Sequence, residues 1–199
     1  RGGGKMTVSL ISVMFTAVIS QNIVLSQYQG ICPFLGVSKK MPSAAGMGFA
    51  VIFVMAIASV FCWPIYNYVL LPLGIEYLYT MAFILVIASL VQLLEMVLKR
   101  FSPTLYSALG VYLPLITTNC AILGTANSTI VFNAYGFAYT FAASVATGVG
   151  FLLAIVLLAG VRLKTDKADI PKCFKGFPIT LVAAAIMAMA FAGFSGILA

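Results

Sequence analysis

The sequence predicts an all-α integral membrane protein with six transmembrane helices, arranged as two inverted three-helix repeats. Hydrophobic residues make up 63% of the 199 residues and charged residues only 8%, whereas soluble proteins carry about 25% charged residues. The chain contains six apolar runs, and crossing a bilayer needs roughly 20 apolar residues. A short Cys-x-x-Leu-Gly element occurs twice. Because these spans leave no soluble domain, we expect a single membrane domain over residues 1–199.

Two of the six runs differ from simple spans. The first is too long for one straight helix and ends in a segment that holds Gly30, Pro33 and Gly36. The fourth contains Pro114 shortly before Cys120. Because proline and glycine interrupt helical hydrogen bonding, we expect the first and fourth helices to be broken. The six runs are Met6–Gly36, Ala44–Trp63, Leu78–Leu98, Thr104–Gly124, Tyr135–Val161 and Phe177–Leu198.

The lysines and arginines predict the orientation, because such residues gather on the cytoplasmic side of membrane proteins. With six spans, Arg1 and Lys5 fall on one side and the other basic residues on the opposite side. We therefore expect a multi-pass membrane protein with both termini outside the cytoplasm. No nucleic-acid partner is expected, although the net charge is +7. No Ala-x-Ala cleavage site follows the basic Arg1–Lys5 segment, so we expect the first span to be retained. The residues assigned to the cytoplasm are Lys39, Lys40, Lys99, Arg100, Arg162, Lys164, Lys167, Lys172 and Lys175.

Internal repetition supports a duplicated architecture. Cys32-Pro-Phe-Leu-Gly36 recurs as Cys120-Ala-Ile-Leu-Gly124, and each copy is followed by Gly-x-Gly-Phe, at Gly46 and at Gly148. The repeats cover about residues 6–98 and 104–198. Each repeat contains three spans. Because three is an odd number, the second repeat begins on the opposite side of the membrane and is inverted relative to the first. Inverted repeats with discontinuous helices meet near the middle of the membrane, where functional sites collect.

The cysteines are the main candidates for chemistry. The chain has no histidine and only four acidic residues. It therefore lacks a histidine base, and it has few carboxylates that could act as a catalytic pair. Cys62 is expected near the outer face and Cys173 in a cytoplasmic loop. The hydrocarbon core is roughly 30 Å thick, so only Cys32 and Cys120 are placed to approach one another. Inert thiols, a disulfide and half of a metal site all remain open.

A metal site would require a second subunit, because iron–sulfur clusters prefer four thiolates. A paralogue with the same architecture is the simplest source of the other two. Thr117, Thr118 and Asn119 precede Cys120 and are candidates to support the cluster, to bind Na⁺ or to join helices. Glu95 is a candidate for an ion pathway. Lys99 lies four residues after it, however, and we favour an ion pair between them.

Several segments resemble the A-type membrane subunits of the bacterial Rnf complex, an ion-translocating ferredoxin:NAD⁺ oxidoreductase. The resemblance runs from about Met6 to Ala199. The E subunit of the Na⁺-pumping NADH:quinone reductase is a close relative. Cys-Pro-Phe at Cys32 and the short Tyr66–Leu78 connection are more like the Rnf proteins. The segments that carry the resemblance are Gly30–Lys40, Phe83–Ala88, Leu109–Gly124 and Phe191–Gly196.

The resemblance implies a specific role for the two cysteines. In this family an A-type subunit pairs with a homologous E-type subunit, and the pair holds a 2Fe–2S cluster with two cysteines from each. Carried over, the ligands here are Cys32 and Cys120. The other implied partners are Rnf subunits B, C, D and G, with membrane lipid around the helices. Such a subunit carries electrons across the membrane, coupled to movement of Na⁺ or H⁺, and is not catalytic alone.

Three alternative functions follow from the same sequence. The chain could be the equivalent subunit of a Na⁺-pumping NADH:quinone reductase. A cofactor-free secondary transporter with inverted repeats would move a solute alone and bind no iron. A scaffold that only assembles a complex would remain active without its cysteines.

Overall fold

The computed structural model describes residues 14–38, 41–101, 115–116, 118–132, 136–165, 167, 171 and 175–195, and these are helical or form turns without any strand. The all-α class is therefore confirmed for this part of the chain. Thr117, Cys173, Pro114 and the basic residues Arg1, Lys5, Lys39, Lys40 and Lys172 lie outside it. The helices are η1 (Thr16–Ser20), α2 (Ile31–Val37), α3 (Met41–Ile65), η2 (Tyr66–Leu70), α4 (Leu71–Leu73), η3 (Glu76–Leu78), α5 (Tyr79–Phe101), α8 (Cys120–Ala126), η4 (Asn127–Phe132), α9 (Phe137–Thr165) and α10 (Phe177–Ser195).

Three helical segments are long and apolar enough to cross a membrane, Met41–Leu73, Tyr79–Met96 and Phe137–Thr165. Two shorter apolar helices, Cys120–Val131 and Phe177–Gly193, accompany them. These five segments overlap five of the six apolar runs, but Met41–Leu73 and Cys120–Val131 continue beyond the predicted ends at Trp63 and Gly124. The six-span inverted repeat stays a prediction.

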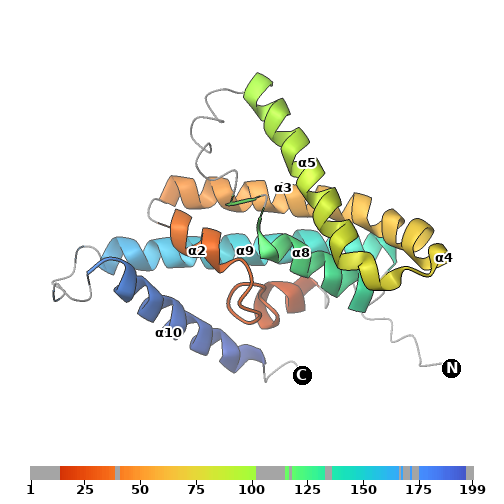
Figure 1. Cartoon of the computed structure of the whole chain (residues 1–199). Helices are drawn as coiled ribbons and strands as arrows, with labels where there is room; N and C mark the ends of the chain where they lie inside the picture. The colour runs from red at the N-terminus through yellow and green to blue at the C-terminus, as the bar shows by residue number, and fades with distance from the viewer. Residues whose placement is uncertain are drawn as a thin grey trace.

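Helices α3 and α9 form the centre of the molecule and lie side by side in opposite directions (Figure 1). A Cβ on Gly48 would overlap Leu152, and a Cβ on Gly148 would lie 3.0 Å from the Ile52 Cα atom. The two contacts are reciprocal, because each glycine meets the residue four positions after the other. Small residues at these points let the two backbones approach closely.

The first and fourth apolar runs are broken, as the sequence predicts. Helix η1 ends at Ser20, residues 21–30 form turns, and α2 begins at Ile31. In the fourth run Leu115 and Ile116 are helical, Thr118 and Asn119 are not, and α8 begins at Cys120. Figure 1 shows both α2 and α8 beginning near the middle of the α3–α9 pair. The two cysteines thus lie in the first turns of the two helices that follow the breaks.

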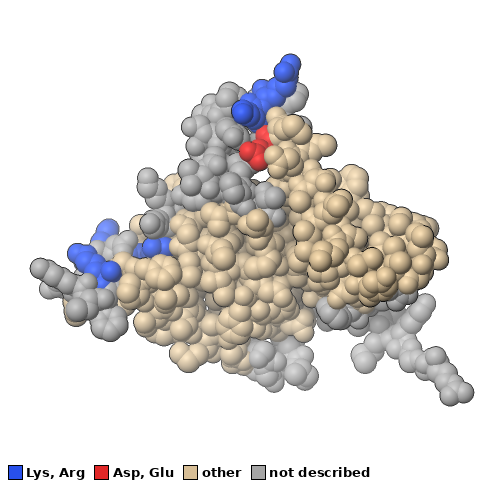
Figure 2. All heavy atoms as spheres, in the orientation of Figure 1, with Lys and Arg blue, Asp and Glu red and all other residues tan. Residues whose placement is uncertain are grey.

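Helices α5 and α10 flank the centre on different sides (Figure 1). Helix α5 contacts α3 and α8 and then leans away from them, while α10 contacts η1 and α9. Much of α5 is apolar and exposed, with Met81 at 70% and Leu85 at 68% exposure, as expected of a helix that faces lipid or another protein chain. Figure 2 shows the basic side chains at the end of α9, beside the start of α10 and at the tip of α5.

Candidate cysteine site

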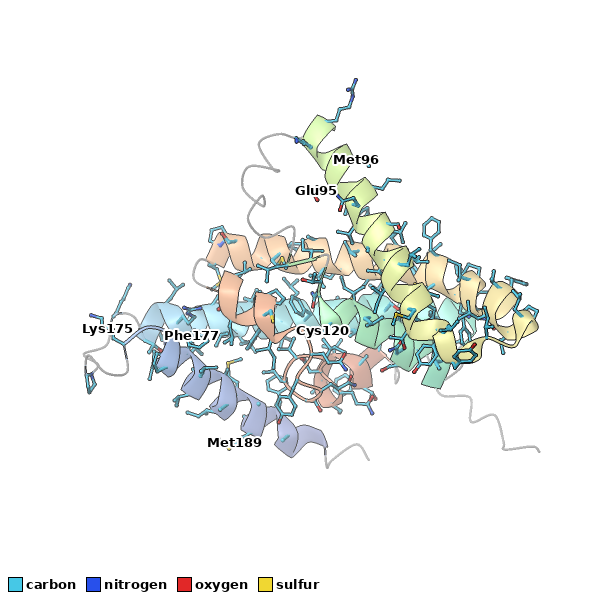
Figure 3. The ribbon with its side chains drawn as sticks, viewed as in Figure 1. Glu95, Met96, Cys120, Lys175, Phe177 and Met189 are labelled. Atoms are coloured by element: carbon cyan, nitrogen blue, oxygen red, sulfur yellow. The ribbon has the colours of Figure 1, made fainter. Side chains whose placement is uncertain are left out.

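The two Cys-x-x-Leu-Gly elements meet through a hydrogen bond to sulfur. The Gly30 backbone N–H donates to the Cys120 Sγ atom over 2.9 Å, joining residues 90 positions apart. Gly30 lies two residues before Cys32, so the start of α2 faces the start of α8. Figure 3 shows Cys120 near the middle of the molecule, beside the turn that precedes α2. The contact joins the segment before Cys32 to Cys120, while the approach of the two cysteines to one another stays a prediction.

Gly30 is held in a position that only glycine suits. Its φ angle is +77°, in the left-handed region that other residues rarely adopt. A Cβ atom there would lie 3.0 Å from the Ala121 Cβ atom and 3.1 Å from both the Asn119 Oδ1 and the Phe151 Cε2 atoms. Three neighbours from α8 and α9 therefore fix the backbone that donates to Cys120.

Asn119 caps α8 and leaves one of its own donors unused. Its Oδ1 atom accepts a hydrogen bond from the Ala121 N–H over 3.1 Å, which satisfies a free N–H of the first helical turn. The side chain is only 5% exposed. Within the described residues, the Asn119 Nδ2 atom has no hydrogen-bond partner, and neither does the nearby Gln29 Oε1 atom. Burying an unsatisfied polar atom is costly, so the Nδ2 donor is a candidate to pair with an acceptor from outside the described residues.

Cys32 has a different environment from Cys120. It is exposed and lines a hollow of about 520 Å³ together with Ile31, Arg162 and Phe177. The Arg162 Nη1 atom donates to the Leu35 carbonyl oxygen over 2.9 Å and to the Ser38 Oγ atom over 2.8 Å. Arg162 thus ties the end of α9 to the end of α2 and places a positive charge in the same hollow as the thiol.

Asn22 organises the first break and is the residue that sequence reasoning missed. Its Nδ2 atom donates to the Val18 and Gly150 carbonyl oxygens over 3.0 and 2.9 Å. Its Oδ1 atom accepts from the N–H groups of Val24 and Leu25 over 3.1 and 3.3 Å. The side chain is fully buried. An available signal was that Asn22 is the only asparagine in the first apolar run.

Of the other candidate residues, Glu95, Thr118 and Cys62 lie in the described part of the chain. Glu95 is half-buried on α5, and Figure 3 shows it away from Cys120, toward the tip of that helix. Thr118 is exposed in the turn before α8, and Thr117 lies outside the described residues. Cys62 is fully buried in α3, which agrees with a structural role. The ion-pathway role of Glu95 stays a hypothesis.

The chemistry of the donor set can be judged from these positions. Cys32 and Cys120 are free and exposed thiols, so the disulfide alternative is not adopted in this structure. Across the described residues, no three histidine, cysteine or acidic side chains come together as a metal site. Two thiolates fit half of a 2Fe–2S centre and cannot hold one alone, because such a centre prefers four thiolates.

Taken together, the long apolar helices and the two helix breaks, each followed by an exposed cysteine, are those of a multi-pass membrane protein. The chain belongs to the family described as "Rnf-Nqr subunit, membrane protein", which it matches over residues 10–198.

Similar proteins of known name span nearly the whole chain. The A-type subunit of the Na⁺-translocating ferredoxin:NAD⁺ oxidoreductase complex of Acetobacterium woodii is 54% identical over 188 residues, covering 94% of this chain and 97% of that protein. The A-type subunit of an ion-translocating oxidoreductase complex from Cronobacter sakazakii is 51% identical, covering 90% of this chain and 93% of that protein. The corresponding Syntrophotalea carbinolica protein is 47% identical, covering 95% and 97%. The expected resemblance to the A-type Rnf subunits is confirmed.

Proposed function

We propose that this chain is the A-type subunit of an ion-translocating ferredoxin:NAD⁺ oxidoreductase, and that it carries electrons across the membrane through a 2Fe–2S cluster shared with a homologous subunit. Cys32 and Cys120 are the two ligands from this chain. The contact between Gly30 N–H and Cys120 Sγ carries the proposal, because it joins the two cysteine elements at one place. The names of the relatives supply the enzyme class.

Ligand counting supports the shared cluster. Both thiols are exposed although their helices are apolar, which leaves them accessible to a partner's ligands. A bound 2Fe–2S centre supplies a one-electron carrier, and with four thiolates its oxidised form carries about two negative charges. Such a charge is costly in lipid unless donors face it. The Gly30 N–H is one such donor, and Arg162 places a positive charge in the hollow that Cys32 lines.

The position of the cysteines suits electron transfer across a bilayer. Roughly 30 Å of hydrocarbon is too wide for one efficient electron step. A carrier near mid-depth divides that distance, and Cys120 lies near the middle of the helices that are long enough to cross (Figure 3). Electrons would enter from iron–sulfur subunits on the cytoplasmic side and leave to a flavin on the outer side.

The remaining parts of the proposal concern partners and placement. The E-type subunit supplies the other two thiolates, and subunits B, C, D and G complete the complex. The chain lies in the bacterial cytoplasmic membrane with both termini outside, and electron flow drives Na⁺ or H⁺ outward. The uneven count of lysines and arginines on the two predicted sides supports this orientation.

The proposal is tested on the purified whole complex with Cys32→Ser, Cys120→Ser and, as a control, Cys62→Ala. Each ligand variant should lose the intramembrane 2Fe–2S signal in electron paramagnetic resonance and about two irons per complex, and NAD⁺ reduction by ferredoxin should stop. The control should keep all three, because Cys62 is fully buried in α3. Unchanged iron content and spectrum in both ligand variants would refute the proposal.

The same variants separate the alternatives. A scaffold predicts that the doubly substituted complex keeps its electron transfer. A cofactor-free transporter predicts that this chain alone takes up a solute in vesicles and binds no iron.

A further inference from the structure

We infer that Gly30 and Asn119 are positioning residues that set the reduction potential of the shared cluster through its Cys120 ligand. The inference rests on the proposed function and goes beyond it, because it assigns the two cysteines unequal roles. Cys120 is the ligand with a fixed hydrogen-bond donor, and that donor belongs to the other repeat.

The Gly30 donor is rigid. Its N–H lies 2.9 Å from the Cys120 Sγ atom, and the residue is enclosed by Ala121, Asn119 and Phe151 at 3.0–3.1 Å from a Cβ position. A backbone packed this closely at its Cα position has little freedom to turn away when the charge on the sulfur changes. Preorganised donors of this kind favour the more negative state without a reorganisation cost.

Asn119 adds a second, independent observation. Its carboxamide oxygen is occupied by the Ala121 N–H, and its Nδ2 atom is buried without a partner in the described part of the chain. Asn119 precedes Cys120 in the chain, and its Oδ1 atom lies 3.1 Å from the Cβ position of Gly30, so its amide group lies beside the residue that donates to Cys120. A cluster sulfur or a thiolate is an acceptor that would satisfy this donor.

The sign of the effect follows from charge. Reduction adds one electron to the cluster, and hydrogen bonds to its sulfurs stabilise the more negative form more than the oxidised form. Losing either donor should therefore make reduction less favourable and lower the potential. Groups that support a ligand in this way tune a metal centre although they do not bind the metal.

The first test is Gly30→Ala in the whole complex, with Gly74→Ala as the matched control. Gly74 also has a positive φ, +68°, but its Cβ position is free of neighbours within 4 Å. An alanine at position 30 is strained at this positive φ and crowds three side-chain atoms at 3.0–3.1 Å, so we expect the backbone to shift and the N–H to sulfur contact to lengthen. We expect the equilibrium constant for one-electron reduction to fall roughly tenfold, which is about 59 mV. The control should keep the potential of the unmodified complex, and both variants should keep their iron.

The second test uses Asn119→Ser, and it decides the question even if the complex with Gly30→Ala does not assemble. Asn119→Ser retains a good helix cap and removes the amide donor, while Asn127→Ser makes the same change two turns further along the same helical segment. A redox titration followed by electron paramagnetic resonance should show a lower potential only for Asn119→Ser.

The outcomes separate this inference from the proposed function. An intact cluster whose potential is the same in Gly30→Ala, Asn119→Ser and the controls overturns this inference alone. Equal shifts in the variants and their controls also overturn it. An unmodified complex that contains no 2Fe–2S cluster overturns both.

Discussion

The two Cys-x-x-Leu-Gly elements share their sequence pattern but differ in almost every contact. The first begins after Gly30, which has a positive φ and no side chain to cap the helix. The second begins after Asn119, whose side chain caps it. Gly36 has open space around it, whereas a Cβ on Gly124 would overlap the Gln29 side chain. The repeated pattern therefore marks two helix starts and two thiols, and it does not determine how each copy is packed.

The two breaks are also held by different means. The second is short and is stabilised locally, by the Asn119 cap. The first spans residues 21–30 and depends on Asn22, whose Nδ2 atom reaches the Gly150 carbonyl oxygen on α9. A long irregular segment leaves many backbone groups without helical partners, so it needs a buried polar side chain to pair them. The first break should be the more sensitive to a single substitution.

The largest expected effect comes from Asn22→Ala. This change removes four hydrogen bonds and leaves buried N–H and C=O groups unpaired, at a cost of about 2–4 kcal/mol. The purified complex should lose its size-exclusion peak at a clearly lower temperature than the unmodified protein. Asn67→Ala is the control, because Asn67 donates to the Trp63 carbonyl oxygen of its own helical segment from a half-buried site. Equal losses in both variants would mean that Asn22 does not hold the break.

A smaller effect is expected from Gly148→Ala on α9. Its Cβ would lie 2.9 Å from the Ile52 Cγ1 atom and 3.0 Å from the Ile52 Cα atom, so α3 and α9 would have to separate. Such overpacking costs about 1–3 kcal/mol. Gly46 occupies the matching place in the first Gly-x-Gly-Phe, yet nothing lies within 4 Å of its Cβ position. Thermal inactivation should therefore distinguish the two alanine variants, and identical midpoints would contradict the packing described above.

The smallest effect is expected from Gly124→Ala. The overlapping group is the end of the Gln29 side chain, which can rotate away, so the loss should be below about 1 kcal/mol. Gly36→Ala should have no measurable effect on the same thermal midpoint, because its surroundings are open. A greater loss at Gly36 than at Gly124 would reverse the comparison and point to a partner chain packed on the first element.

Much of the fold follows from the sequence because its signals are local. Long apolar runs predict helices, and Gly30 predicts a break in the first run, which the structure confirms. The repeat also predicts that Cys32 and Cys120 act together, and this pairing stays a prediction. The role of Asn22 could not be predicted, because its partner Gly150 lies 128 positions away. The hydrogen bond to Cys120 could not be predicted from the sequence either, because its donor is a backbone N–H group, which every residue except proline has.

The sequence separation between Asn22 and Gly150 determines how late in synthesis their hydrogen bond can form. The Asn22 amide cannot meet the Gly150 carbonyl oxygen until 128 further residues have been added. At roughly 5–20 residues per second, that wait is on the order of ten seconds. During it the turn from Gln21 to Gly30 must persist in the membrane without its anchor. A nascent chain that stalls before α9 therefore lacks the Gly150 acceptor that anchors Asn22.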